Sequence, residues 1–82
     1  NWKMNPPTEL AALKLVSGVK KEFSISDFKN LKTEVVFCPP SVFIKGVAAN
    51  LKNSLFKIGA QNVFYEESGT FTGEVSAKML AD

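Results

Sequence analysis

The residues of this chain best suited to chemistry are the amides and the ammonium group at its start. Alternation along an extended strand places Asn1, Lys3 and Asn5 on one side and the apolar Trp2 and Met4 on the other. The carboxyl ends of inner parallel strands are where α/β enzymes hold their ligands and catalytic groups. Taken without its neighbours, such a lysine is ordinarily a solvated surface residue. We expect the two apolar residues to pack inside the fold.

A second polar group follows the apolar run 55–58 and the small pair Gly59-Ala60, which fits a crowded sheet edge. Gln61 and Asn62 put two amides where this predicted strand ends, again a place where parallel sheets present ligands. A long connection then leads to Ser76, whose hydroxyl we expect to cap a helix. Connections this long are usually functional or disordered, and the aromatics in this one argue against disorder. The alternative is a solvated surface loop with a few packed aromatics.

The elements that must position these groups begin with a helix from about Thr8 to Glu22, with Thr8 as its N-cap. Its apolar residues recur near helical spacing: Leu10, Ala12, Leu13, Val16, Val19 and Phe23. Residues 24–32 are mostly polar and predict a connection between two elements. We expect the apolar side chains in it to lie under the end of the preceding helix. Those side chains belong to Ile25, Phe28 and Leu31.

The apolar run 35–38, ended by Pro39 and Pro40, predicts a strand that is buried on both faces. Ser41 is expected to cap a second amphipathic helix, and residues 54–60 to form the next strand. The inner face of that helix would carry Val42, Phe43, Val47, Ala48 and Leu51, opposite Lys45, Asn50 and Lys52.

Strands that alternate with helices over short connections predict a parallel α/β sheet with right-handed crossovers. We expect one domain over residues 1–82 without linkers. The chain begins at Asn1 without an initiator methionine and ends at Asp82 inside the predicted last helix. We therefore expect it to be a fragment or a processed piece.

Composition excludes several function classes. A net charge of +2 with no arginine argues against nucleic acid as a partner, and no apolar run approaches a membrane span. The absence of histidine removes the commonest metal ligand and the commonest general base. The single cysteine, Cys38, is expected to be buried and inert, and Glu66 and Glu67 to be solvated. The broad class is a soluble, globular, intracellular protein.

Two stretches carry a family resemblance. Asn-Trp-Lys-Met-Asn at residues 1–5 resembles the segment after the first strand of triosephosphate isomerases. Gly-Ala-Gln-Asn at residues 59–62, with Phe-Thr-Gly-Glu at 71–74 and a serine-led helix, resembles their third strand and third loop. The resemblance covers all 82 residues but only about the first third of such an enzyme. It implies part of a (β/α)8 barrel, from the end of strand 1 to the start of helix 3.

The resemblance also implies a function: interconversion of dihydroxyacetone phosphate and glyceraldehyde 3-phosphate by enediol proton transfer, without a cofactor or metal, in cytoplasmic glycolysis and gluconeogenesis. It makes Lys3 the catalytic electrostatic residue and Asn1 a substrate-binding partner. The family is a standard example of a glutamate base paired with a neutral histidine, and both would lie beyond Asp82. The isolated chain should therefore be inactive and should require the remainder of the barrel.

The same resemblance implies a homodimer that forms through the 62–75 loop, with Phe71, Thr72, Gly73 and Glu74 at the interface. Thr72 would reach the active-site Asn and Lys of the partner. Two readings from other classes compete with the isomerase. One is a non-catalytic α/β interaction module or truncated paralogue that uses the loop for docking. The other is a small dinucleotide-binding domain, which would need a glycine-rich turn that the chain lacks.

Overall fold

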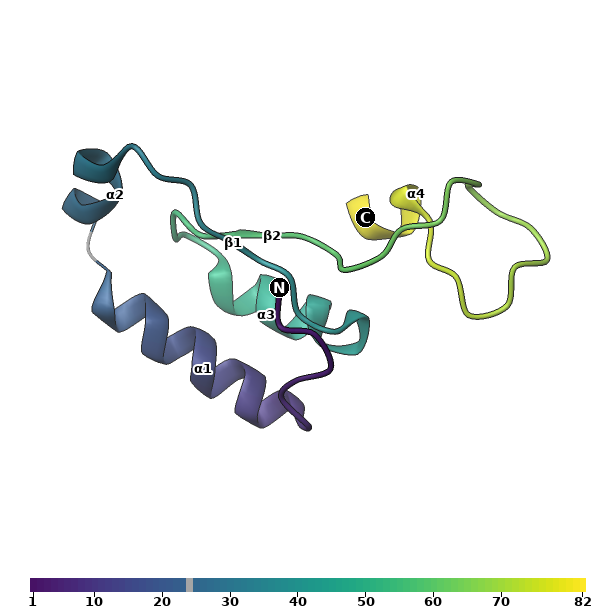
Figure 1. The fold of residues 1–82 in the computed structure, drawn as a ribbon, viewed down its shortest axis with the longest axis horizontal. Coiled ribbons are helices and arrows are strands. Elements are labelled where there is room, and N and C mark those ends of the chain that lie inside the picture. The colour runs from purple at the N-terminus through teal and green to yellow at the C-terminus, as the bar shows by residue number, and fades with distance from the viewer. Residues whose placement is uncertain (24) are drawn as a thin grey trace.

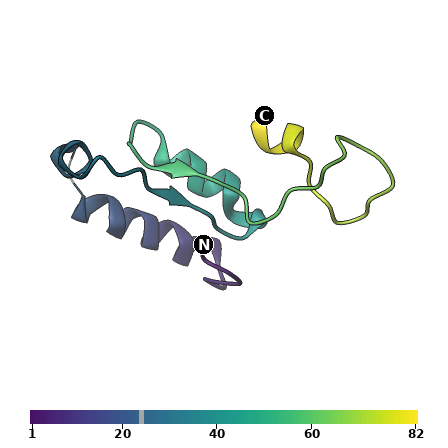
Figure 2. The same cartoon turned by 45° about the horizontal axis from the view of Figure 1, so that its top comes forward.

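The computed structural model of the chain describes residues 1–23 and 25–82, without the side chains of Ile25, Phe28 and Leu31. Two short parallel strands lie beside two helices, and a long loop extends away from them toward the carboxyl end (Figures 1 and 2). The elements in chain order are α1 (Glu9–Glu22), α2 (Ile25–Leu31), β1 (Val36–Phe37), the 3-10 helix η1 (Ser41–Phe43), α3 (Ile44–Leu51), β2 (Lys57–Ile58) and α4 (Ala77–Ala81).

The first helix forms as its sequence predicts. Thr8 has an extended backbone, and its Oγ1 accepts a hydrogen bond from the Ala11 amide at 3.2 Å, which satisfies one free donor of the first turn. Ala12 and Val16, one turn apart, are completely buried. The prediction of a helix over 8–22 is confirmed.

The prediction of a polar connection at residues 24–32 is wrong, because most of this region forms the helix α2. Apolar residues three apart, at 25, 28 and 31, are compatible with helical turns, but the polar residues between them made the segment look like a loop. The expected placement of the Ile25, Phe28 and Leu31 side chains lies outside the part of the chain that the structure describes.

The two strands are parallel, as predicted, and shorter than predicted. Val36 pairs with Lys57 and Phe37 with Ile58, and the Gly59 amide donates to the Phe37 carbonyl at 2.8 Å. The expectation of a strand buried on both faces is wrong for this chain. Phe37 is 8% exposed, whereas Val36 is 43% exposed. Phe37 packs in the core with α1 and α3, and no described residue buries Val36 on the opposite face.

The segment before α3 corrects two further predictions. Ser41 does not cap the helix, because residues 41–43 form the 3-10 turn η1 and the position before it is Pro40, which has no side-chain cap. Val42 is largely exposed although it was expected on the inner face. A 3-10 turn has three residues per turn, so the spacing that holds within α3 does not extend back to Val42. Val47 and Leu51, inside α3, are buried as predicted.

The core lies where α1 and α3 pack against each other and against the strand pair. Trp2 packs on its edge, with its ring 5.7 Å from that of Phe37 in an edge-on arrangement. The buried apolar residues are Ala12, Val16, Phe37, Val47, Leu51 and Phe56. None of the described helices is long and apolar enough to cross a membrane.

Candidate functional site

The amino-terminal segment meets the ends of both strands at one edge of the sheet. The Trp2 amide donates to the Cys38 carbonyl, just beyond β1, at 3.0 Å. The Nε2 atom of Gln61, three residues beyond β2, donates to the same carbonyl at 2.8 Å and to the Lys3 carbonyl at 2.9 Å. Three chain segments therefore converge on the Cys38 and Lys3 carbonyls, and Lys3 lies at this convergence.

The backbone at Lys3 is left-handed, with φ of 58°. Its amide donates to the Oδ1 of Asn1 at 2.8 Å, and its carbonyl accepts from Gln61. Two side-chain amides thus hold a conformation that costs a residue with a Cβ about 1–2 kcal/mol. The Lys3 side chain itself is exposed.

The left-handed residue also explains why simple alternation is wrong for this segment. Residues 1–5 form no strand, and Met4, expected to pack inside, is 92% exposed. Trp2 is partly buried against the core, as predicted. A strand alternates its side chains only while its backbone stays extended, and the turn at Lys3 ends that regularity.

Asn62 connects this edge to the loop that follows. Its Nδ2 donates to the Oε2 of Glu74 at 3.2 Å, across the base of the loop. Nearby, the Phe64 amide donates to the Val75 carbonyl at 2.9 Å, and Phe64 forms a parallel bridge with Ser76. Ser76 caps α4 as predicted, because its Oγ accepts from the Met79 amide at 3.3 Å. The two ends of the loop are therefore fastened together.

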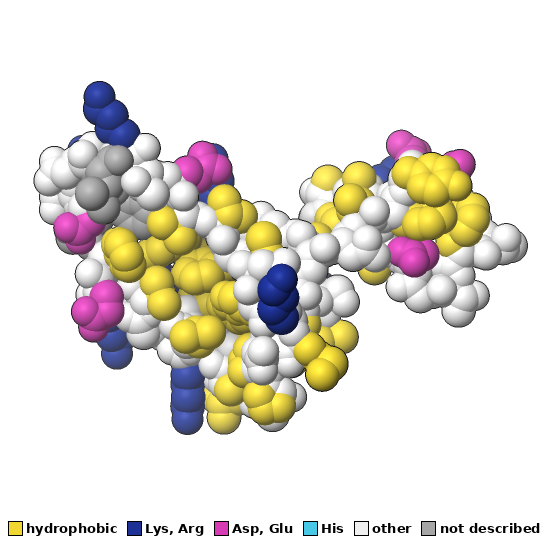
Figure 3. Space-filling model, viewed as in Figure 1, with side chains coloured by type: hydrophobic (Ala, Val, Ile, Leu, Met, Phe, Trp, Pro, Cys, Tyr) yellow, Lys and Arg dark blue, Asp and Glu magenta, His cyan; other side chains and the backbone are white. Residues whose placement is uncertain are grey.

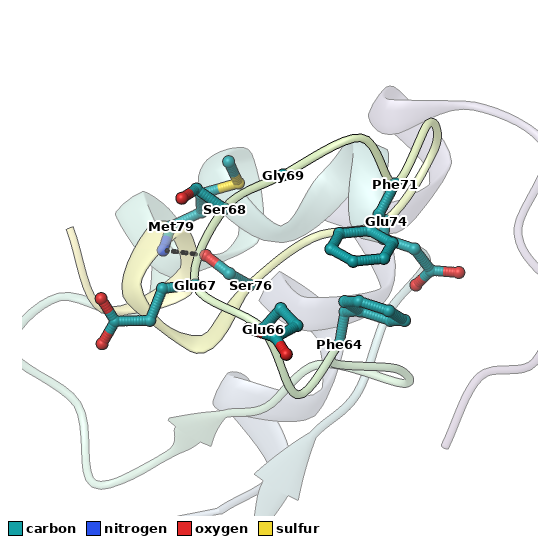
Figure 4. A pocket seen from close by; sticks show the side chains of 9 residues that line it. All are labelled: Phe64, Glu66, Glu67, Ser68, Gly69, Phe71, Glu74, Ser76 and Met79. Atoms are coloured by element: carbon teal, nitrogen blue, oxygen red, sulfur yellow. Dashed lines mark hydrogen bonds between the residues drawn. The ribbon is translucent and has the colours of Figure 1, made fainter.

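Inside the loop, aromatic rings lie against one another beside a pocket (Figure 4). The ring of Phe64 is 4.5 Å from that of Phe71 and 4.6 Å from that of Tyr65. Gly69 has a φ of 143°, and a Cβ built there would lie 2.6 Å from the Phe71 ring. Phe71 thus covers part of its own loop and stays 40% exposed. The carboxylates of Glu66 and Glu67 are exposed, as expected.

The tip of the loop is a tight turn over residues 71–74. The Glu74 amide donates to the Phe71 carbonyl at 3.0 Å, and Gly73 has a φ of 89°. A positive φ at the third residue is what a type II turn requires. This turn presents Thr72 and Gly73 to solvent.

The structure therefore gathers the predicted site residues into two groups. One is Asn1 with Lys3 at the sheet edge, and the other is the 71–74 turn. The sequence places the amide of Gln61 at a strand end, where parallel sheets present ligands, but no pattern in it indicates the two bonds to main-chain carbonyls. Cys38 is half-buried and not buried as expected, because it lies just past the end of the short strand.

The family model "Triosephosphate isomerase" matches residues 1–82. Over all of its 82 residues the chain is 44% identical to the triosephosphate isomerases of Rhodopirellula baltica and of Clostridium botulinum strain Loch Maree, covering 30% and 31% of them. The corresponding protein of Natranaerobius thermophilus is 46% identical over 83 positions, 30% of its length. The chain thus spans about 30% of these relatives. No solved structure matches it.

Proposed function

We propose, because the chain belongs to the triosephosphate isomerase family, that it forms the amino-terminal part of a barrel that interconverts dihydroxyacetone phosphate and glyceraldehyde 3-phosphate. The observation that carries this proposal is the convergence of Asn1, Lys3 and Gln61 at the carboxyl ends of the parallel strands. Polar groups gathered at that edge are what barrel enzymes use to hold a substrate.

In this function Lys3 supplies positive charge to the substrate phosphate and to the oxygen that becomes negative in the enediolate. Asn1 binds the substrate and holds the backbone of Lys3, for which its 2.8 Å hydrogen bond gives support. A fixed charge aimed at developing negative charge in a dry site is typically worth about 3–4 kcal/mol. The proton-transfer groups come from outside this segment, since the chain has no histidine, and the 82 residues alone are inactive.

The segment is a partial barrel that runs from the end of the first barrel strand to the start of the third barrel helix, without linkers. Residues 1–5, which form no strand themselves, would lie at the end of the first barrel strand, with β1 and β2 as the second and third strands and α4 as the start of the third helix. Val36 supports this assignment, because its exposed side is the face that the interior of a closed barrel would cover.

The enzyme is a homodimer that assembles through the 62–75 loop, with the 71–74 turn at the interface. The side chains of Val63, Tyr65 and Phe71, all in the loop, are exposed. Figure 3 shows apolar side chains gathered at the loop end of the molecule with acidic side chains beside them. Exposed apolar groups of this kind commonly mark interaction surfaces. Thr72, at the tip of the turn, would reach Asn1 and Lys3 of the second copy.

The reaction belongs to glycolysis and gluconeogenesis in the cytoplasm. Its substrate is a small phosphorylated triose, and it uses neither nucleic acid nor a membrane as a partner.

The test uses a complete barrel: this segment continued by the rest of its own chain or, if that chain ends at Asp82, by the remainder of the Rhodopirellula baltica relative. Lys3→Ala should lower kcat/KM by roughly 10²–10³-fold, because it removes a charge that acts in the transition state. Lys14→Ala, an exposed lysine of α1, is the matched control and should keep normal turnover. Steady-state rates of Lys3→Ala within about tenfold of the parent would contradict the proposal.

A further inference from the structure

We propose that Gln61 is a positioning residue, whose side-chain amide holds the backbone of Lys3 in its left-handed conformation and thereby aims the lysine. The inference rests on the proposed function, in which Lys3 is the catalytic lysine. Gln61 itself need not touch the substrate, because it acts on a main-chain carbonyl.

Hydrogen-bond capacity makes this arrangement specific. A side-chain amide nitrogen carries two hydrogens, and Gln61 uses one on the Lys3 carbonyl at 2.9 Å and the other on the Cys38 carbonyl at 2.8 Å. The Cys38 carbonyl has two lone pairs, and the Trp2 amide takes the second at 3.0 Å. Gln61 therefore links Lys3 to the end of β1. A glutamate of the same shape has no side-chain donor when ionised, so its carboxylate would repel both carbonyl oxygens.

The backbone conformation of Lys3 requires hydrogen bonds that hold it in place. With φ of 58° it lies in a region that residues with a Cβ rarely occupy, and the side chain leaves the backbone in a direction set by that angle. Its two main-chain polar groups are both bound by side-chain amides, the N–H by Asn1 and the carbonyl by Gln61. The Asn1 bond spans only two residues and can move with the segment, whereas the Gln61 bond spans 58 and fixes Lys3 relative to the sheet.

The experiment is a double-mutant cycle in the complete barrel. Gln61→Met keeps the side-chain length and removes both donors, and we expect it to lower kcat/KM about 10- to 100-fold through misplacement of the lysine. In the Lys3→Ala background Gln61→Met should lower kcat/KM by less than about twofold, because the lysine that Gln61 positions is no longer there. Gln61→Glu should be worse than Gln61→Met. Asn30→Asp, an exposed amide of α2, controls for the added charge.

The possible outcomes distinguish the role of Gln61 from the role of Lys3. An equal fold-loss in both backgrounds would show that Gln61 does not act through Lys3, while a large effect of Lys3→Ala would leave the proposed function standing. If Lys3→Ala has no effect, the proposed function fails. The crystal structure of Gln61→Met then tests the tie alone: residue 3 should leave its left-handed conformation, and an unchanged backbone there overturns the inference. If Gln61→Met does not fold, the parent crystal structure decides, and Nε2 farther than about 3.5 Å from both carbonyls overturns it.

Discussion

Two regions of the molecule are held together by different means. The α/β layer, formed by α1, β1, α3 and β2, is built on burial, and Ala12, Val16 and Val47 are wholly shielded from water. The 62–75 loop is built on hydrogen bonds at its base and on stacked rings, and no apolar residue described within it is buried. The layer has a buried apolar core of its own, although Val36 leaves one face of its strands open, whereas the apolar residues of the loop are covered by no such core.

The shape of the chain reflects this difference. Its radius of gyration is 14.2 Å, against about 12 Å for a compact domain of this length, and its extents are 46 × 27 × 19 Å. Figure 1 shows the loop projecting from the layer at one end. The loop is therefore the region where assembly should matter most, and the layer is where packing should matter most.

The largest expected effect comes from breaking the loop in the complete barrel. Replacing Phe71 with Gly and Thr72 with Asp removes an aromatic anchor and places a charge in the proposed interface. Central anchors of this kind contribute about 2 kcal/mol or more, so the dimer dissociation constant should rise at least roughly 30-fold, and activity should fall with it. Sedimentation equilibrium measured alongside kinetics tests both.

The control for this prediction is Asn30→Asp, which adds the same charge to an exposed residue of α2, outside the loop and the sheet edge, and should leave the dimer intact. A loop variant that stays dimeric at nanomolar concentration with normal turnover would mean that the 62–75 loop does not hold the two copies together.

A second effect, on stability and not on assembly or activity, is expected from the core of the layer. Leu51→Ala removes a buried side chain of α3 and should lower the free energy of unfolding by about 2–5 kcal/mol while leaving the activity of folded enzyme normal. Lys45→Ala, exposed on the same helix, should change it by no more than about 0.5 kcal/mol. Urea titrations of the complete barrel give both values. Equal effects of the two substitutions would contradict the assignment of the core.

The smallest effect comes from two glycines, one in each region. Gly18 lies in α1, and a methyl group added there would have nothing within 4 Å, so Gly18→Ala should stabilise the fold by about 0.5–1 kcal/mol. Gly69→Ala should give no such gain, because its φ is 143° and the methyl group would meet the Phe71 ring. Thermal melts rank the two variants. A stabilised Gly69→Ala would mean that the ring moves freely and that the loop is not packed as described.

Features with short-range causes were predictable from the sequence. Thr8 and Ser76 cap helices because a hydroxyl can reach an amide three residues ahead, whatever the rest of the chain does. Val47 and Leu51 are buried together because residues four apart share a helix face. The same reasoning failed at Ser41, where a 3-10 turn replaces the expected cap, since propensity alone does not distinguish the two kinds of turn.

By itself, then, the sequence determined the first helix, the helical character of residues 44–51, the parallel pairing and the family, since these depend on local patterns and motif spacing. Only the tertiary structure decided the left-handed turn at Lys3, the open face of Val36 and the two hydrogen bonds of Gln61. Each depends on groups far apart in the chain. Gln61 donates to the carbonyl of Lys3, 58 residues away, and no periodic pattern predicts which carbonyl a side-chain amide will reach. That placement follows from how the helices pack the strands side by side.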